Sequence, residues 1–195
     1  MILAVVLIIA YLLGSIPNGL IFVRAIWHID LRERGSQNTG ATNAWRVVGK
    51  TAGLLVFALD FFKGFLAVFI AEICTDPPLQ FTAMALAGIF AVIGHSLSVF
   101  MKFRGGKGVA TGLGVITFLM PKVTAIVFLT WLVIVLATRY VSLGSIVAAV
   151  LTPILAWIFD LPTEFILFGL AAAVLIVVRH RANIIRLING NENKI

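Results

Sequence analysis

The stretch TAGLLVFALDFFKGFLAVFI, from Thr51 to Ile70, decides the fold class of this chain. Within it only Asp60 and Lys63 carry a charge, and a helix needs about 20 mostly apolar residues to cross the ~30 Å hydrocarbon core of a bilayer. The two charges are three positions apart on one helix face, where they can neutralise each other as a structural pair. The segment therefore predicts a transmembrane helix.

Six similar segments lie on either side of it, so the whole chain resembles this stretch. Hydrophobic residues make up 61% of the 195 residues, against roughly 45–50% in soluble domains. The further apolar segments are residues 2–24, 81–101, 109–120, 122–139, 142–159 and 163–179. We predict an all-α, polytopic membrane bundle of seven transmembrane helices, some of them short, in a single domain over residues 1–195. A five-span bundle with two re-entrant hairpins is the structural alternative.

The basic residues indicate how such a bundle is oriented. Of the 15 lysines and arginines, all but Lys63 and Lys122 fall in the loops after the odd-numbered spans or in the C-terminal tail. Basic loops stay in the cytoplasm, so we predict an outer N-terminus and a cytoplasmic C-terminus. No basic region precedes residues 2–24, so this segment is expected to be a retained span, not a cleaved signal peptide.

Composition also excludes other classes of function. The net charge of +7 is compatible with nucleic-acid binding, but the bases lie between membrane segments and not along one soluble face. Cys74 is the only cysteine, so no internal disulfide can form. The three histidines are far apart in sequence with no carboxylate cluster beside them, which gives no support for a metal site.

A glycine–lysine loop, KFRGGKGVAT from Lys102 to Thr111, is the strongest candidate for an anion site. Glycines expose backbone N–H groups, and the lysines and arginine supply positive charge. It is not a nucleotide P-loop, because Met101 and Gly108 stand where that pattern needs Gly and Ser or Thr. The apolar segment 109–120 that follows would rise only about 18 Å as a helix. We therefore expect the loop at the rim of a cavity.

Two more polar segments lie on the predicted cytoplasmic side. DLRERGSQNTGATN, Asp30–Asn43, is followed by Arg46 and is rich in groups that can bind an anion, although a solvated loop with Thr42 or Asn43 capping the next helix is an equal alternative. HRANIIRLINGNE, His180–Glu192, places His180 and Asn183 on one helix face, with a basic helix on anionic lipid as its alternative. Ser142 is most simply a helix N-cap.

Together these segments offer bases, amides and hydroxyls but no nucleophilic triad and no metal ligands. That combination suits phosphorylated substrates that bring their own activation, such as an acyl phosphate, whose phosphate is a good leaving group. Acyl transfer from it needs orientation and charge stabilisation more than covalent catalysis. A groove between spans would hold the acyl chain. A transporter or flippase for a phosphorylated metabolite is the alternative function, although the polar segments gather on one face.

The motifs also resemble a known family over nearly the whole chain. GSIPNG (14–19), RGSQNTGATN (34–43), Asp60 with Lys63-Gly64, KFRGGKGVAT (102–111), RYVSLGS (139–145) and HRANIIRLINGNE (180–192) resemble the bacterial acyl-phosphate:glycerol-3-phosphate acyltransferases. Two departures are that Gln37 replaces the family's usual glycine and that Leu97-Ser98 replaces a usual Phe-Pro. Neither change removes a charged group.

This resemblance implies transfer of a fatty acyl group from acyl phosphate to the 1-position of glycerol 3-phosphate. The products would be lysophosphatidic acid and inorganic phosphate, with no cofactor; the partners would be the two substrates and the bilayer, and a monomer is plausible. By motif match the catalytic residues would be Lys107, His180, Asn183 and Ser36, and the phosphate-binding residues Arg46, Asn38, Thr42, Asn43, Gly105, Gly106, Gly108, Ser142 and Arg186. His180 would serve either as a general base or to position a phosphate.

Overall fold

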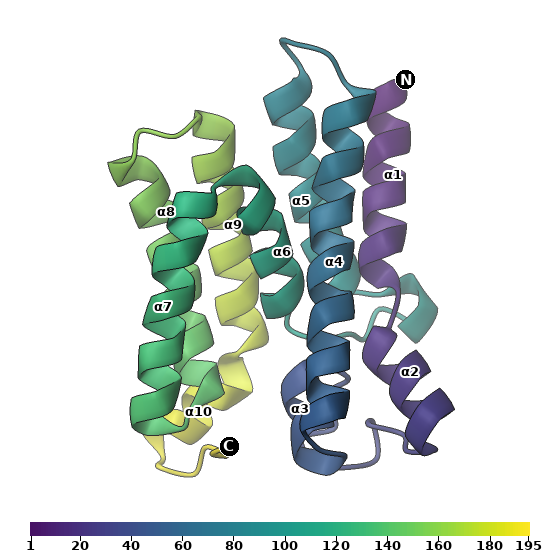
Figure 1. The fold of residues 1–195 in the computed structure, drawn as a ribbon, viewed down its shortest axis with the longest axis vertical. Helices are drawn as coiled ribbons and strands as arrows, with labels where there is room; N and C mark the ends of the chain where they lie inside the picture. The colour runs from purple at the N-terminus through teal and green to yellow at the C-terminus, as the bar shows by residue number, and fades with distance from the viewer.

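The computed structural model describes residues 1–195 as a bundle of helices without a strand (Figure 1). In chain order the helices are α1 Ile2–Ser15, α2 Asn18–Trp27, α3 Ala41–Val47, α4 Lys50–Cys74, α5 Gln80–Ser96, α6 Val109–Leu119, α7 Pro121–Thr138, α8 Val141–Ile158, α9 Thr163–Arg179 and α10 Arg181–Ile188. A short 3-10 turn, Val99–Met101, follows α5. The prediction of an all-helical membrane protein is confirmed.

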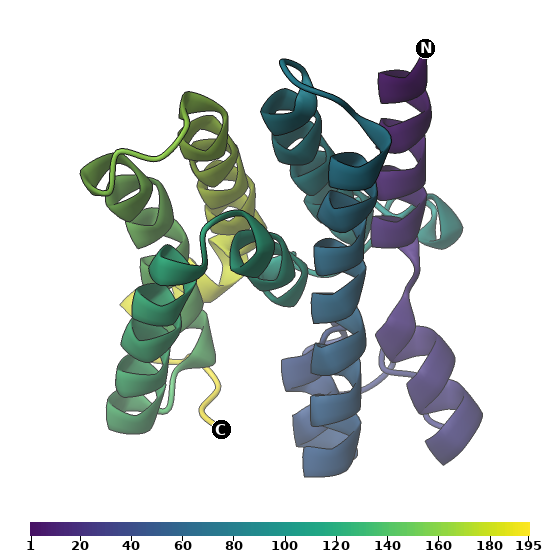
Figure 2. The same cartoon turned by 45° about the horizontal axis from the view of Figure 1, so that its top comes forward.

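The helices form two groups that α6 joins (Figures 1 and 2). In one group α1, α4 and α5 pack on one another, with α3 along the end of α4. In the other, α7, α8 and α9 pack together. Helix α6 packs extensively on α4, and α5 also contacts α9. Because α4 makes no extensive contact with α7 or α8, the two groups enclose a space beside α6.

Five segments are long and apolar enough to cross a membrane, namely α1 with α2, α4, α5 with its 3-10 turn, α7, and α8. Helices α9 and α10 together make a sixth, bent by 61°. Helix α6 has 11 residues, which corresponds to about 16 Å. It ends before Met120, and Pro121 begins α7 at a position that proline favours. The fourth apolar segment therefore forms a short helix of its own, which is not among the segments long enough to cross a membrane, and it does not continue beyond Pro121.

The first apolar segment is one candidate span, as predicted, but it consists of two helices, because Pro17 cannot donate a backbone hydrogen bond and separates α1 from α2. One prediction about a helix cap is wrong. Thr42 and Asn43 lie within the separate helix α3 and do not cap the next span. Gly49 precedes α4 instead, with a φ of 129° that favours glycine.

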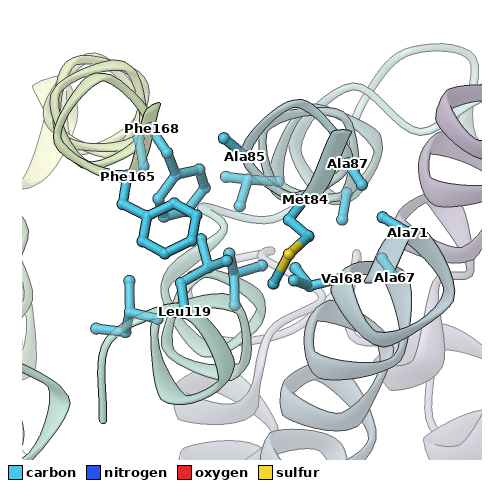
Figure 3. Close-up of a cluster of buried hydrophobic side chains, with 14 of the residues drawn as sticks. Ala67, Val68, Ala71, Met84, Ala85, Ala87, Leu119, Phe165 and Phe168 are labelled. Carbon is cyan, nitrogen blue, oxygen red and sulfur yellow. The ribbon is translucent and has the colours of Figure 1, made fainter. Parts of the chain in front are cut away.

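The main hydrophobic core lies where α4, α5, α6 and α9 meet (Figure 3). Alanines on α4 and α5, among them Ala67, Ala71 and Ala87, are fully buried. Small residues let membrane helices approach closely, and this packing is the main source of their association. Phe168 from α9 is also fully buried and packs in the same cluster. This core holds α6 against both groups of helices.

A second internal contact is ionic. Asp60 and Lys63 of α4 are buried and form a salt bridge of 2.9 Å, as the sequence predicts. Asn18 Nδ2 donates to Asp60 at 3.0 Å. Lys63 Nζ donates at 2.9 Å to the carbonyl of Ile16, which lies in the break between α1 and α2. The ion pair therefore stabilises the break that Pro17 creates.

Candidate active site

One large cavity, about 420 Å³, lies between the two groups of helices. It is lined by residues of α3 to α10, with His95 as the contribution of α5. Almost every residue that the sequence proposed for the site lines it: Ser36, Asn38, Thr42, Asn43, Arg46, Lys107, Gly108, Ser142, His180, Asn183 and Arg186. The fold thus brings three segments that are far apart in sequence to one place.

Lys107 lies at the centre of a hydrogen-bonded chain. Its Nζ donates to Asn183 Oδ1 at 2.6 Å, and Asn183 Nδ2 donates to Glu192 Oε1 at 2.7 Å. A lysine ammonium has three donors, and this chain uses one of them. The remaining donors are available to the oxygens of an anion in the cavity.

Glu192 is a functional residue that the sequence reasoning missed. It is buried, and besides Asn183 it accepts hydrogen bonds from Ser142 Oγ at 2.9 Å and from Arg186 Nε at 2.8 Å. The interpretation of Ser142 as an N-cap is wrong, because the residue at that position is Tyr140 and Ser142 lies within α8. A glutamate at the end of the HRANIIRLINGNE motif was the only sequence signal for this role.

The pKa values of Lys107 and Glu192, the two charged groups of this hydrogen-bonded series, are both lowered. Burial lowers the pKa of the Lys107 ammonium to about 8, and neighbouring arginines act in the same direction while Glu192 opposes them. For the Glu192 carboxyl, burial alone would raise the pKa. Hydrogen bonds from Asn183, Ser142 and Arg186 outweigh burial, so its pKa lies below the usual value. At neutral pH the site therefore holds an ammonium and a carboxylate, separated by one amide.

His180 stands at the bend between α9 and α10 and is buried. Its Nδ1 lies 2.8 Å from the carbonyl oxygen of Ile176, so Nδ1 carries the proton and donates it. In the neutral ring this leaves Nε2 as an acceptor on a side chain that lines the cavity. The ring is oriented by a backbone carbonyl and not by a carboxylate.

The Asp30–Asn43 segment is held by its own amides. Asn43 Oδ1 accepts from the backbone N–H of Ser36 at 2.9 Å, and its Nδ2 donates to the carbonyls of Leu31 and Arg34. Asn38 Oδ1 accepts from the N–H of Gly40 in the same way. Asn38 and Asn43 thus shape the loop around Ser36.

Arg46 connects this loop region to the C-terminal tail. Its guanidinium donates to the backbone carbonyl of Asn193 at 2.8 Å. The adjacent Glu192 is the carboxylate of the Lys107 chain. Arg46 therefore helps to hold the tail over the polar end of the cavity.

Gly105 and Gly106 do not line the cavity, unlike the other proposed site residues. Their carbonyls accept hydrogen bonds from the Arg179 guanidinium at 2.8 and 3.2 Å. Arg179 is a second residue that the sequence reasoning did not single out, since its partners lie more than 70 positions away. These two glycines therefore anchor the loop to α9 through Arg179, and Lys107 is the loop residue that lines the cavity.

The deeper part of the cavity is apolar. Gly112, Ala148, Ala149, Ala172 and Ala173 line it, and small side chains on α6, α8 and α9 leave room for a slender ligand. Leu54 of α4 and Phe128 of α7 also line it and are 59% and 42% exposed. Because these exposed residues belong to helices that do not pack extensively on each other, the groove opens sideways between α4 and α7.

A polytopic helical bundle with a buried lysine at the polar end of an apolar groove is the arrangement expected of a membrane enzyme that acts on phosphorylated lipids. Residues 4–190 match the family model described as "Glycerol-3-phosphate acyltransferase". The chain belongs to this family.

Curated relatives and solved structures agree with this assignment. The chain is 46% identical to the glycerol-3-phosphate acyltransferase of Syntrophomonas wolfei, over 98% of this chain and 96% of the relative. It is 41% identical to that of Staphylococcus haemolyticus, over 100% and 98%. A crystal structure of PlsY (YgiH), an integral membrane glycerol 3-phosphate acyltransferase in its glycerol 3-phosphate form, superposes with a TM-score of 0.93 at 40% identity, covering 99% of this chain and 95% of that one. The lysophosphatidic acid form gives 0.89 at 39% identity, covering 98% and 94%.

Proposed function

We propose that this protein transfers a fatty acyl group from an acyl phosphate to the 1-position of sn-glycerol 3-phosphate. The products are lysophosphatidic acid and inorganic phosphate, and the reaction is the first step of phospholipid synthesis. One observation carries the proposal: Lys107, with donors to spare, stands where the polar end of the cavity meets the apolar groove. A phosphate at Lys107 and an acyl chain in the groove are the two ends of one acyl phosphate molecule or of one lysophosphatidic acid molecule.

The reaction needs no covalent acyl-enzyme and no cofactor. The 1-hydroxyl oxygen of glycerol 3-phosphate attacks the acyl carbonyl carbon, the new ester C–O bond forms, and the carbon–oxygen bond to phosphate breaks. The departing phosphate takes up the hydroxyl proton. His180 Nε2 accepts a hydrogen bond from the attacking hydroxyl and orients it. In this role His180 does not need a carboxylate partner to stabilise an imidazolium, which agrees with its Nδ1 contact to Ile176.

The basic groups around the cavity divide the work of binding. Lys107 and Arg186 stabilise the phosphate charges, with Asn183 between them as the positioning amide and Arg46 at the loop side of the same cavity. Ser36, Asn38, Thr42 and Asn43 form the wall opposite, and Ser142 holds Glu192 in place. Gly105, Gly106 and Gly108 give the loop its shape. All of these residues belong to one domain spanning residues 1–195.

We also propose that the polar end of the cavity faces the cytoplasm of a bacterial cell. In Figure 1 the N-terminus and the C-terminus lie at opposite ends of the bundle, and α3 and α10 lie toward the end of the C-terminus, with the loop that leads into α6 between them and the middle of the bundle. With α6 counted as a seventh, short crossing, the positive-inside rule gives an outer N-terminus and a cytoplasmic C-terminus. Cysteine accessibility at Met1 and Ile195 in intact cells tests this orientation.

The activity is tested with purified protein in detergent or lipid. Palmitoyl phosphate should release inorganic phosphate only when glycerol 3-phosphate is present, and lysophosphatidic acid should form in equal amount. Palmitoyl-CoA in place of palmitoyl phosphate is the matched control, and equal activity with both donors would refute the donor assignment. Movement of glycerol 3-phosphate across sealed vesicles without acyl transfer would instead support a transporter.

A further inference from the structure

The glycine–lysine loop packs against His95, a cavity-lining histidine that the proposed mechanism does not use. His95 of α5 has a side chain only 9% exposed, and its backbone carbonyl accepts a hydrogen bond from the N–H of Gly106 at 3.1 Å. Its ring lies directly under the same glycine. A Cβ on Gly106 would be 2.1 Å from His95 Nε2, far inside van der Waals contact.

The same two glycines are also held by Arg179, whose guanidinium donates to the carbonyls of Gly105 and Gly106. They are thus fixed by a residue of α5 and by a guanidinium at the end of α9. The next residue along the chain is Lys107, whose Nζ donates to Asn183. Because the preceding peptide is held by both contacts, the Lys107 backbone has little freedom, and this restricts where its ammonium lies in the cavity.

The His95 ring is itself held by polar groups within the membrane-spanning helices. Its Nδ1 lies 3.1 Å from Thr111 Oγ1 and 3.7 Å from Asp60 Oδ1. Asp60 is in turn bonded to Lys63 and Asn18. Ionisable groups inside a membrane are costly and are usually kept for a function. This cluster ties the ring to α2, α4 and α6 at once.

We propose that His95, held by Thr111 and the Asp60–Lys63–Asn18 cluster, is a positioning residue that sets the place of the Lys107 ammonium through Gly106. The inference rests on the proposed function, because it assigns His95 to the same phosphate site. It also gives Gly106 a role other than the phosphate binding expected from the sequence. A glycine is needed here because the His95 ring occupies the space that a side chain would fill.

A pair of substitutions separates this role from simple packing. Gly106→Ala pushes the loop off the ring, and a displacement of about 1 Å at a site can cost roughly 100-fold in activity. His95→Ala removes the ring but keeps the backbone carbonyl, and it leaves a void where the new Cβ fits. We therefore expect the double variant His95→Ala/Gly106→Ala to have a kcat/KM at least about tenfold above that of Gly106→Ala.

Gly105→Ala is the matched control. A Cβ at Gly105 would meet the backbone oxygen of His95 at 2.2 Å, and this atom remains when the side chain is removed. His95→Ala should therefore not improve Gly105→Ala. Losses in His95→Ala/Gly106→Ala that simply multiply, or equal rescue of both glycine variants, would overturn the proposal.

Thr111→Val supplies a second test in case the alanine variants fold poorly. It keeps the shape of the side chain but removes the hydroxyl next to His95 Nδ1, and we expect roughly a tenfold lower kcat/KM together with a modest fall in melting temperature, because a buried nitrogen loses its partner. The high-pH limb of the rate should also move, because Lys107 becomes better hydrated, whereas a loss of folded protein lowers the whole profile without moving it. A wild-type profile in Thr111→Val refutes the positioning role. If the wild-type chain itself fails to transfer the acyl group, the proposed function is what fails.

Discussion

Two clusters in this protein are built from the same three chemical groups, a lysine, an asparagine and a carboxylate. In the first, Lys63 contacts Asp60 directly at 2.9 Å and Asn18 adds a hydrogen bond to the same carboxylate. In the second, Asn183 stands between Lys107 and Glu192 and bonds to both. The order of the groups is what differs.

That order decides what each lysine can do. Lys63 is paired with its carboxylate, and a further donor is used by the Ile16 carbonyl, so the first cluster is closed: it supports the helix break and the His95 ring and offers no unpaired ammonium to a ligand. Lys107 has only an amide oxygen as its partner, while Ser142, Asn183 and Arg186 satisfy the carboxylate of Glu192. An amide placed between the charges thus leaves the charge of the ammonium without a directly paired carboxylate, so that a substrate anion can pair with it.

The largest expected effect comes from removing the free lysine. Lys107→Ala should lower kcat/KM by about 1000-fold, because a preorganised donor to a developing charge contributes about that much. The melting temperature should stay close to that of the wild type, since Lys107 contacts one side chain and no carboxylate. Phosphate release from palmitoyl phosphate measures the loss, and near-normal turnover would show that the loop does not bind substrate.

The closed lysine should behave in the opposite way. Lys63→Met leaves the Asp60 carboxylate buried without its charged partner, and breaking a buried pair in this way costs about 3 kcal/mol or more. A marked fall in melting temperature is expected. Asp60→Asn in the same chain should recover part of it, because no unpaired charge then remains; equal stability of Lys63→Met and wild type would contradict the closed nature of this cluster.

Asn183→Asp converts the second cluster into the first. The new carboxylate would pair directly with Lys107 and repel Glu192, so the ammonium would no longer be free for phosphate. We expect kcat/KM to fall about 100-fold, with most of the fall in the KM of a phosphorylated substrate. Asn183→Leu is the control that removes the amide without adding a charge. A larger loss of kcat/KM in Asn183→Leu than in Asn183→Asp would mean that the amide contacts matter more than keeping the Lys107 ammonium free of a paired carboxylate.

The pH dependence gives the smallest but most direct test of the free ammonium. The pKa of Lys107 is lowered to about 8, chiefly by burial, so the group is charged below that pH and neutral above it. The kcat/KM of the wild type should therefore be level below pH 8 and fall about tenfold per pH unit above it. In Lys107→Arg the side chain stays protonated throughout, so any remaining activity should lack this limb. An unchanged limb in that variant would assign it to another group.

The helices could be predicted well from the sequence because membrane spans consist of long apolar runs. The observed α4, α7, α8 and α9 begin and end within a few residues of the expected bounds. It also identified the residues around the cavity, since their polar side chains stand out in an apolar chain. Eleven of the thirteen proposed residues line the cavity, and the exceptions are Gly105 and Gly106.

What the sequence could not reveal depends on contacts across long separations. Glu192 meets Ser142 across 50 positions and Arg179 meets Gly106 across 73, and no local pattern records such pairs. The break at Pro17 was missed because hydropathy continues through it. The reason for Gly106 was missed because the ring that requires it comes from another helix.

The sideways opening of the groove between α4 and α7 has a consequence for how the enzyme meets its substrates. Leu54 and Phe128 line the groove and are also exposed, and both belong to helices long and apolar enough to cross a bilayer. The water-soluble glycerol 3-phosphate can then enter from the aqueous side and the apolar acyl donor from the bilayer, and the two react at the interface. The acyl chain of the product can then leave through the lateral opening between α4 and α7 directly into the bilayer, without passing through water.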